Sequence, residues 1–483
     1  MEDPSVNNSR EIDEEALITE DEFSQQDQRY FDGRRMHKVP QSMRFKKHEE
    51  DYYAPKMVSF GPYNHGLPKL RMVEEFKPIV LTMFVSRSGK DREFFYNMIL
   101  EVIDQVRNCY VGVSRDVYND GALAEMMLLD ACFAIYLMKI KLGDTKMYFH
   151  FRQHFGMAAW SFVFLDMGLL ENQIPLWVIE LSINLIYGNK EESMLLWNCL
   201  SSYIFGKCRL TRIPGEDKER PLHFLDACHR LLVTEWDNAG KKLVQPVSKC
   251  QWFLAGKKIV QPVSKCQWFL AGKKIVQPVS KCQWFLAWPW KKESPHEFGI
   301  FNRQFRSVTE LKAKGIYFKP SSNCLKDVKF KSYKLFGQIQ LPIWFFSDHS
   351  KQFFLNMIAY EASPESDVDF PTICYINFLK SLIVKPEDVK ELREKKILFS
   401  SLDGDEQIVQ VIKDIDTCGI DLPPIFNEVK MRIEEHCSNK AKTWIAELFH
   451  TYFRNPWTFI ALLAATFLLC LTFLQTYYTI NKP

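Results

Sequence analysis

The sequence lacks several features that mark common functional classes. Its formal net charge is only +3 over 483 residues, which argues against nucleic-acid binding through bulk charge. It contains no glycine-rich nucleotide loop, complete set of metal ligands or nucleophile motif. We therefore predict no catalytic, cofactor-binding or metal-binding residue, and no cofactor. An enzymatic role is left open, and a role without catalysis is favoured.

The amino-terminal region lacks both the basic stretch and the apolar stretch of a signal peptide. Residues 1–30 instead hold ten acids against two arginines, and the next twenty residues turn basic. Because such segments bury too little apolar surface to fold, residues 1–45 are predicted to form a disordered tail. The 13 cysteines are odd in number and scattered, which is typical of reduced thiols and not of a disulfide framework.

Charge is also missing from one long stretch near the carboxyl terminus. Residues 457–480 contain no charged side chain, and as a helix they would extend ~36 Å. This length exceeds the ~30 Å hydrocarbon core of a bilayer. Trp457 begins the run and Tyr477 and Tyr478 lie near its end, where amphipathic rings favour the two interfaces. The run is predicted to be a transmembrane helix in contact with membrane lipid.

The charges that flank this run predict an orientation. Lys440, Lys442 and Arg454 precede it and only Lys482 follows it, which favours a cytosolic body. Since three residues follow the run, insertion is expected after synthesis, in a tail-anchored, single-pass topology. The sequence does not indicate which membrane holds the protein or which proteins are its partners.

Helical periodicity runs through much of the remaining sequence. The predicted fold class is mainly α: a helical globular domain with a small β-hairpin element and one C-terminal transmembrane helix. The most apolar candidate is Gly121–Ile140, which is expected to be a central buried helix. The other expected helices are Phe94–Tyr110, Phe162–Leu181 with a break at Pro175, Pro386–Leu398 and Gln407–Ile415.

Two stretches predict extended structure. Leu325–Trp344 alternates apolar and polar residues on both sides of a short break, which is typical of a β-hairpin or a pair of strands. A short strand is expected over Met57–Phe60, where the chain then meets several glycines and prolines. A helix is expected to begin after Pro68.

A 16-residue unit occurs three times, at 240–255, 256–271 and 272–287. The copies differ only at Leu243, Ile259 and Ile275, and such near-identity indicates a tandem duplication and not a capped solenoid. We interpret it as an inserted loop between two halves of one domain, 46–239 and 288–450. The alternative is a lipid-adsorbing scaffold, because each copy carries three lysines beside Trp and Phe.

Three acids lie within strongly apolar sequence: Asp130, Asp166 and Glu171. Buried carboxylates cost several kcal/mol unless they are paired or hydrogen-bonded. One interpretation is a carboxylate pair for acid/base chemistry or for a metal. The other is helix capping and buried hydrogen bonding, with Glu171 and its neighbours holding a helix junction ahead of Pro175. The lack of a complete ligand set favours the second.

Three histidines are also candidates for chemistry. His150 and His154 are four residues apart and would share a helix face, a spacing that can hold a metal. They lack the intervening glutamate of a zinc-protease helix, and a half-exposed aromatic face explains them equally well. His65 precedes Gly66 without a second histidine at ligand spacing, which favours a turn position.

These landmarks, in this order, resemble a plant family called domain of unknown function 247, which includes UPF0481-like membrane proteins. The resemblance covers roughly residues 53–480 and is interrupted by the repeats. The matching stretches are VSFGPYNHG at 58–66, MMLLDACF at 126–133, LLENQIP at 169–175, TELKAKGIYF at 309–318, NMIAYE at 356–361 and NPWTFIALLAA at 455–465.

The resemblance implies a mostly helical protein with one C-terminal membrane segment. No enzymatic activity is established for the family, so no catalytic residue is carried over. Some grass members are linked to pollen–stigma self-incompatibility, which implies recognition or signalling at a membrane. We therefore expect a membrane-anchored interaction or signalling protein without catalysis. The alternative is a membrane-tethered enzyme using the buried carboxylates.

Overall fold

A computed structural model of the chain describes residues 35–44, 51–187, 193–205, 221–233, 305–321, 324–364, 370–419, 425–439 and 456–480. The three repeats and residues 1–34 lie outside these ranges, so the predictions made for them stay predictions. The division of the chain into two halves around the repeats likewise stays a prediction.

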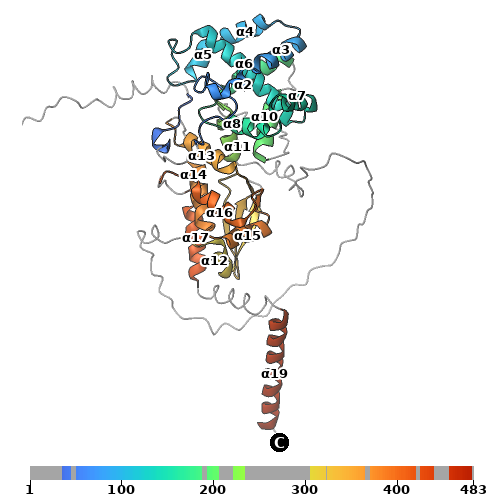
Figure 1. Cartoon of the computed structure of the whole chain (residues 1–483). Helices are drawn as coiled ribbons and strands as arrows, with labels where there is room; N and C mark the ends of the chain where they lie inside the picture. The colour runs from blue at the N-terminus through green and yellow to red at the C-terminus, as the bar shows by residue number, and fades with distance from the viewer. Residues whose placement is uncertain are drawn as a thin grey trace, which may run out of the picture. The chain divides into compact units, whose positions relative to one another are not determined.

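The structure confirms a mainly α fold with small sheets (Figure 1). The described helices of the amino-terminal half are η1 (Gln41–Arg44), η2 (Pro68–Leu70), α2 (Arg71–Glu74), α3 (Lys77–Ser88), α4 (Arg92–Leu100), α5 (Ile103–Asn108), α6 (Asp120–Lys141), α7 (Thr145–Phe155), α8 (Ala159–Met167), α9 (Leu176–Tyr187), α10 (Ser193–Phe205) and α11 (Phe224–Val233).

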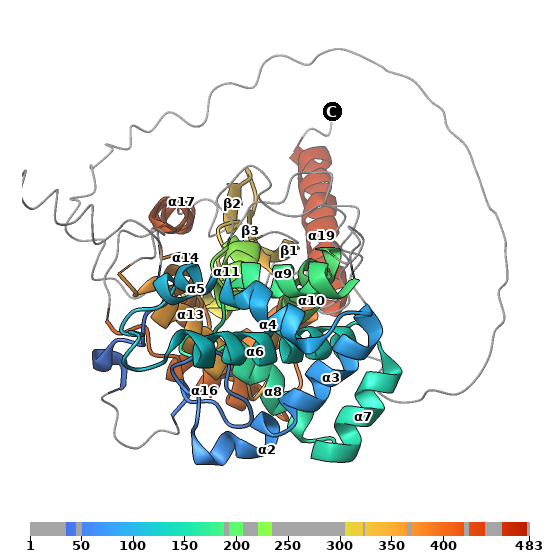
Figure 2. The ribbon, with the colours of Figure 1, turned by 90° about the horizontal axis from the view of Figure 1, so that it is seen from above.

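Helix α6 is the centre of this half, as its apolar sequence predicts. It begins at a cap in which the Asn119 side chain accepts the Ala122 amide, which satisfies one of the free donors of the first turn. Apolar side chains cover nearly its whole circumference and are buried. Helices α3, α4, α9 and α10 pack around it (Figure 2), so it forms the core on which the other elements are arranged.

Two predictions for this half are wrong in detail. Phe94–Tyr110 is not one helix, because α4 ends at Leu100 and α5 begins at Ile103. Residues 57–60 form no strand. Their backbone amides are bound by side chains from a segment more than a hundred residues away, and that long-range pairing replaces a sheet ladder. A helical segment does follow Pro68, as expected.

The carboxyl-terminal half combines helices with two small sheets. Its elements are α12 (Val308–Ala313), β1 (Ile316–Ser321), β2 (Lys329–Ser332), β3 (Gly337–Pro342), β4 (Trp344–Phe346), α13 (Ser350–Glu361), α14 (Pro371–Leu382), α15 (Pro386–Glu394), β5 (Leu398–Ser400), α16 (Asp405–Asp414) and α17 (Asn427–Ser438).

The predicted β-hairpin is confirmed as the antiparallel pair β2–β3. Two further pairings were not predicted: β1 runs parallel to β3 on its other edge, and β4 runs parallel to β5. Parallel pairs join segments that are far apart in the sequence, so local alternation gives little sign of them. The three-stranded sheet has the order β1-β3-β2.

Buried polar side chains of α13 join the two halves. Asn356 on α13 accepts the Leu170 amide and donates to the Tyr52 carbonyl, with N···O distances of 2.9 and 3.0 Å. Glu361, at the end of α13, binds His229 of α11 at 2.7 Å, and α11 and α13 lie side by side in Figure 1. The three side chains in these contacts, Asn356, Glu361 and His229, are buried, and the two halves share one packed body.

Among the residues that the structure describes, two helices are long and apolar enough to cross a membrane: α6 and α19 (Pro456–Ile480). In the apolar window of α6, 78% of residues are buried within the protein, whereas none is buried in that of α19. Helix α6 is therefore a core helix. The predicted C-terminal apolar helix is present, and its apolar side chains have no protein core to cover them.

Candidate functional site

Two of the three acids singled out in the sequence, Asp130 and Asp166, hold the backbone of one loop. Asp166, at the end of α8, accepts hydrogen bonds from the amides of Lys56, Met57 and Val58, at 2.7–3.0 Å. The side chain of Asn172 accepts the amide of Phe60 at 2.8 Å. Four amides of residues 56–60 are thus satisfied without a strand, and we call residues 56–61 with these side chains the loop clasp.

Asp130 completes the loop clasp from the middle of α6. It accepts the Gly61 amide at 2.7 Å and the Lys77 ammonium at 2.6 Å. Lys77 is fully buried and also donates to Glu74 and to the Ser59 carbonyl. Three acceptors around one ammonium offset the cost of burying it, so Lys77 fastens the loop to α3 and α6 together.

Only glycine fits at the end of the loop clasp. Gly61 has a φ of +74°, and a Cβ atom built on it would lie 2.3 Å from the Gln173 carbonyl oxygen. A positive φ is costly for residues with a Cβ, and the close approach excludes a side chain as well. The local backbone geometry thus explains why glycine occupies position 61 in VSFGPYNHG.

Glu171 acts on a different segment, the last ten residues of the predicted tail. It accepts the Val39 amide at 2.7 Å and pairs with Arg44 at 2.8 Å. In the same segment Met36 forms a bridge with Tyr110 and is buried. Residues 35–44 are therefore held against the helical body partly by Glu171. This fits the interpretation of Glu171 as a structural residue at a helix junction.

Burial dominates the electrostatics of the two buried aspartates. It raises the pKa of Asp166 to about 6, although the three backbone amides oppose the rise. It also raises the pKa of Asp130, against the attraction of the Lys77 ammonium. The oxygens of both carboxylates face these donors, so the arrangement fits the structural interpretation and leaves them poorly placed for proton transfer to a substrate.

Among the described residues, none of the three candidate histidines forms a hydrogen bond or ion pair with Asp166. His150 and His154 share a face of α7 with ring centroids 4.7 Å apart, as predicted. His150 lies 3.2 Å from the Tyr136 hydroxyl, and His154 binds the His150 carbonyl. Burial and the neighbouring His154 lower the pKa of His150. His65 lies 3.8 Å from a carboxylate oxygen of Glu74, which in turn accepts the hydroxyl of Ser59.

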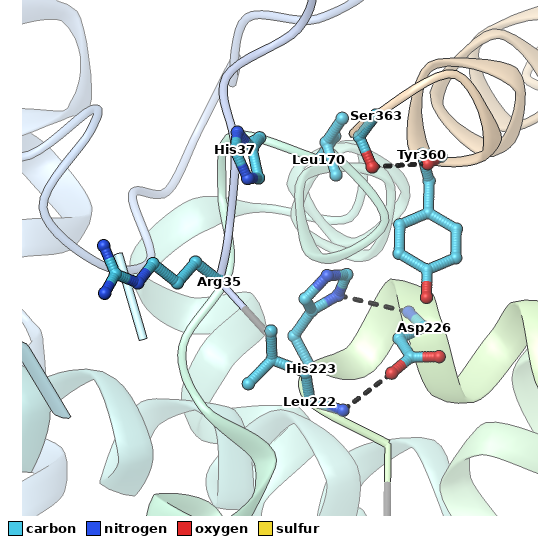
Figure 3. A pocket seen from close by; sticks show the side chains of 8 residues that line it. All are labelled: Arg35, His37, Leu170, Leu222, His223, Asp226, Tyr360 and Ser363. Carbon is cyan, nitrogen blue, oxygen red and sulfur yellow. Dashed lines mark hydrogen bonds between the residues drawn. The ribbon is translucent and has the colours of Figure 1, made fainter. Parts of the chain in front are cut away.

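A small polar hollow, which sequence reasoning missed, lies where α11, α13 and residues 35–37 meet (Figure 3). Asp226 accepts the Leu222 amide at 2.7 Å and pairs with Arg230, and its own amide donates to His223. Burial favours a higher pKa for Asp226, but His223, Arg230 and the Leu222 amide lower it below its usual value.

The hollow has room for about one or two water molecules, whereas organic ligands occupy sites of about 300 Å³ or more. Its carboxylate is already engaged in capping α11. Across the part of the chain that the structure describes, no group of three His, Cys, Asp or Glu side chains is arranged to hold a metal ion. The described carboxylates therefore organise the backbone.

Four of the six stretches that carry the family resemblance contribute to these buried contacts. Residues 58–66 supply the loop, 126–133 supply Asp130, 169–175 supply Glu171 and Asn172, and 356–361 supply Asn356. A model of plant proteins of unknown function, DUF247, matches residues 36–471. The chain belongs to this family.

Two UPF0481 proteins of Arabidopsis thaliana are similar to this DUF247 protein. One is 24% identical over 447 residues, which cover 88% of this chain and 82% of the relative. The other is 22% identical over 482 residues, covering 88% of this chain and 87% of the relative. No solved structure matches the chain. The family is one of unknown function, so the comparisons indicate no catalytic role.

Proposed function

We propose that this DUF247 protein is a membrane-anchored interaction or signalling protein that acts without catalysis. The observation that carries the proposal is the contrast between the two long apolar helices. Helix α6 buries its apolar side chains in the protein core, whereas no residue in the apolar window of α19 is buried within the protein. A bilayer supplies the apolar surroundings that α19 lacks.

The chemistry of α19 fits lipid surroundings. Its 25 residues extend ~37 Å, enough to cross a ~30 Å core with some tilt. The hydroxyls of Thr472, Thr476 and Thr479 donate to the backbone carbonyls four residues earlier, so these polar groups need no water. Trp457 at one end, with Tyr477 and Tyr478 at the other, suits the two interfaces.

The absence of catalysis is supported by what the buried carboxylates do. Asp130, Asp166 and Glu171 each bind backbone amides, and the polar hollow beside Asp226 is too small for an organic substrate. A protein with a rigid body and a membrane helix can instead act by binding other proteins. The basic residues that precede α19 favour a cytosolic body.

Alkaline carbonate extraction of membranes that carry the full chain tests the anchor. Leu468 lies near the middle of α19 and is 62% exposed. Leu468→Arg places a charge at the bilayer centre at a cost of about 3 kcal/mol, so we expect much of the protein to move to the soluble fraction. Leu468→Ala is the control and should stay in the pellet. Complete extraction of the unchanged chain would contradict the proposal.

A further inference from the structure

The β2–β3 hairpin exposes an unusual group of aromatic and basic side chains. Tyr333 and Phe336 lie in its turn with ring centroids 4.7 Å apart, and Tyr317 of β1 packs edge-on against Phe336 at 5.9 Å. Leu335 between them is 54% exposed. Together with Lys331 and Lys334, which are also exposed, these residues form what we call the hairpin tip.

The hairpin tip is ordered by its own backbone. The Tyr333 amide donates to the Phe336 carbonyl at 2.8 Å, which closes the turn. The strand register places Lys331 and Tyr317 on either side of Gln338, so all three lie on the outer face of the sheet. The apolar side chains are thus exposed by a fixed turn and not by fraying of a chain end.

The charge of the hairpin tip is uncompensated. Among the residues that the structure describes, no acid forms an ion pair with Lys331 or Lys334. The opposite face of the hairpin, in contrast, packs on α17, where Phe330 contacts the ring of His436. The outer face and turn therefore combine free positive charge with exposed aromatic rings, a composition suited to the interface of an anionic bilayer.

Helix α17, the last described helix before α19, packs beside this same hairpin. His436 binds the hydroxyl of Ser332, the residue that precedes the turn, at 2.8 Å. Helix α17 ends two residues later at Ser438, and α19 begins at Pro456. The connecting chain can extend at most ~60 Å, so a membrane that holds α19 lies within reach of the hairpin tip.

We propose that the hairpin tip is a second membrane contact, which inserts its aromatic side chains at the interface of an anionic bilayer while Lys331 and Lys334 bind lipid headgroups. This inference rests on the proposed anchor and deepens it, because two contacts fix the orientation of the body above the membrane. A protein partner is less suited to this surface. Stable protein interfaces bury about 800 Å² per partner, whereas these side chains gather on one turn.

Photoactivatable lipid labelling of the full chain in proteoliposomes tests the proposal. A phosphatidylserine carrying a carbene-generating group is mixed into the vesicles, and labelled peptides are mapped by mass spectrometry. Each lysine contributes about fivefold to binding an anionic surface. We therefore expect labelling of residues 331–336 to be at least about fivefold higher with phosphatidylserine than in vesicles whose probe and bulk lipid are both phosphatidylcholine.

Two pairs of variants make the test specific. Lys331→Glu with Lys334→Glu should reduce labelling of the hairpin tip to the phosphatidylcholine level. Lys69→Glu with Lys413→Glu changes the net charge equally at two other exposed positions and should leave it unchanged. Leu335→Ser removes the most exposed apolar side chain of the turn and should also lower labelling, without altering any charge.

Labelling of α19 reports the anchor independently in the same sample. Labelled α19 with an unlabelled hairpin tip would overturn this inference but would still support the membrane anchor. The hairpin tip would then be a candidate surface for binding a protein partner. A labelled hairpin tip with unlabelled α19 would support the contact and contradict the anchor. Absence of label from both would contradict both proposals.

Discussion

Buried carboxylates in this protein bind backbone and shape a loop. Asp166 binds three consecutive amides, and Asp130 joins Gly61 to a buried lysine. A side chain that satisfies several amides replaces the pairing that a strand would otherwise provide. The loop clasp thus lets residues 56–61 cross the helical core without a sheet.

Asp166→Asn should destabilise the folded protein by about 3 kcal/mol. The amide nitrogen would face backbone N–H donors, which leaves at least one buried donor unsatisfied. Denaturant unfolding of the full chain in detergent measures the change. Asp403→Asn at an exposed position should shift the free energy of unfolding by less than about 0.5 kcal/mol, and equal effects of the two changes would contradict the loop clasp.

The raised pKa of Asp166 predicts that the stability of the unchanged chain, relative to that of Asp166→Asn, depends on pH. The pKa of Asp166 is about 6 in the folded state, against an ordinary value of 3.8 for an aspartate in the unfolded chain. Between these two pH values the folded protein therefore binds a proton more readily than the unfolded chain does. Stability contributed by this group therefore increases as the pH falls from 6 to 4, by up to about 1.4 kcal/mol per pH unit. The difference in unfolding free energy between the unchanged chain and Asp166→Asn should widen over this range. If this difference narrowed as the pH fell, the backbone amides would lower the pKa of Asp166 by more than burial raises it.

The sequence could identify the residues of the loop clasp but not their partners. Asp130, Asp166 and Glu171 are conspicuous because they are acids in apolar sequence. The amides that Asp166 binds lie 108–110 positions earlier, and local periodicity carries no information at that separation. Lys77 gave no signal at all, since nothing in its neighbours marks it as buried.

At the scale of elements, long uniform patterns were predictable and interruptions were not. Helix α6 was predicted to within one residue at each end, because a 20-residue stretch that is apolar on nearly every face favours a buried helix over any alternative. The break between α4 and α5 at Glu101 and Val102 was missed, since the apolar face continues through it. Strand β1 was missed because its partner β3 lies in a parallel register that only the folded chain brings together.

The contact between helix α13 and the loop that follows α8 depends on the buried side-chain amide of Asn356. Asn356 is fully buried and makes three hydrogen bonds, to Leu170, Tyr52 and Gln352. Asn356→Leu keeps the side-chain volume close but leaves backbone groups unsatisfied, so we expect a loss of about 3 kcal/mol. Thermal unfolding measures it, with Asn97→Leu on the exposed face of α4 as the control. A loss no greater than that of the control would contradict this joint between the halves.

At the scale of the molecule, the repeats are predicted to be an inserted loop. Deleting residues 256–287 removes two copies and roughly halves the chain between residues 233 and 305. Loop-closure entropy then changes the free energy of unfolding by only about 0.5 kcal/mol. We expect unchanged localisation and liposome binding, measured by fractionation and flotation. Loss of either would instead favour the lipid-adsorbing scaffold.

Membrane anchoring with a cytosolic body is the central claim, and protease protection on sealed microsomes tests it most directly. Epitope tags are placed before Met1 and after Pro483 on the full chain. The account predicts that protease removes the amino-terminal tag while the membrane protects the carboxyl-terminal tag. The reverse pattern would contradict the orientation and make recognition outside the cytosol the leading function, and digestion of both tags would contradict the membrane span itself.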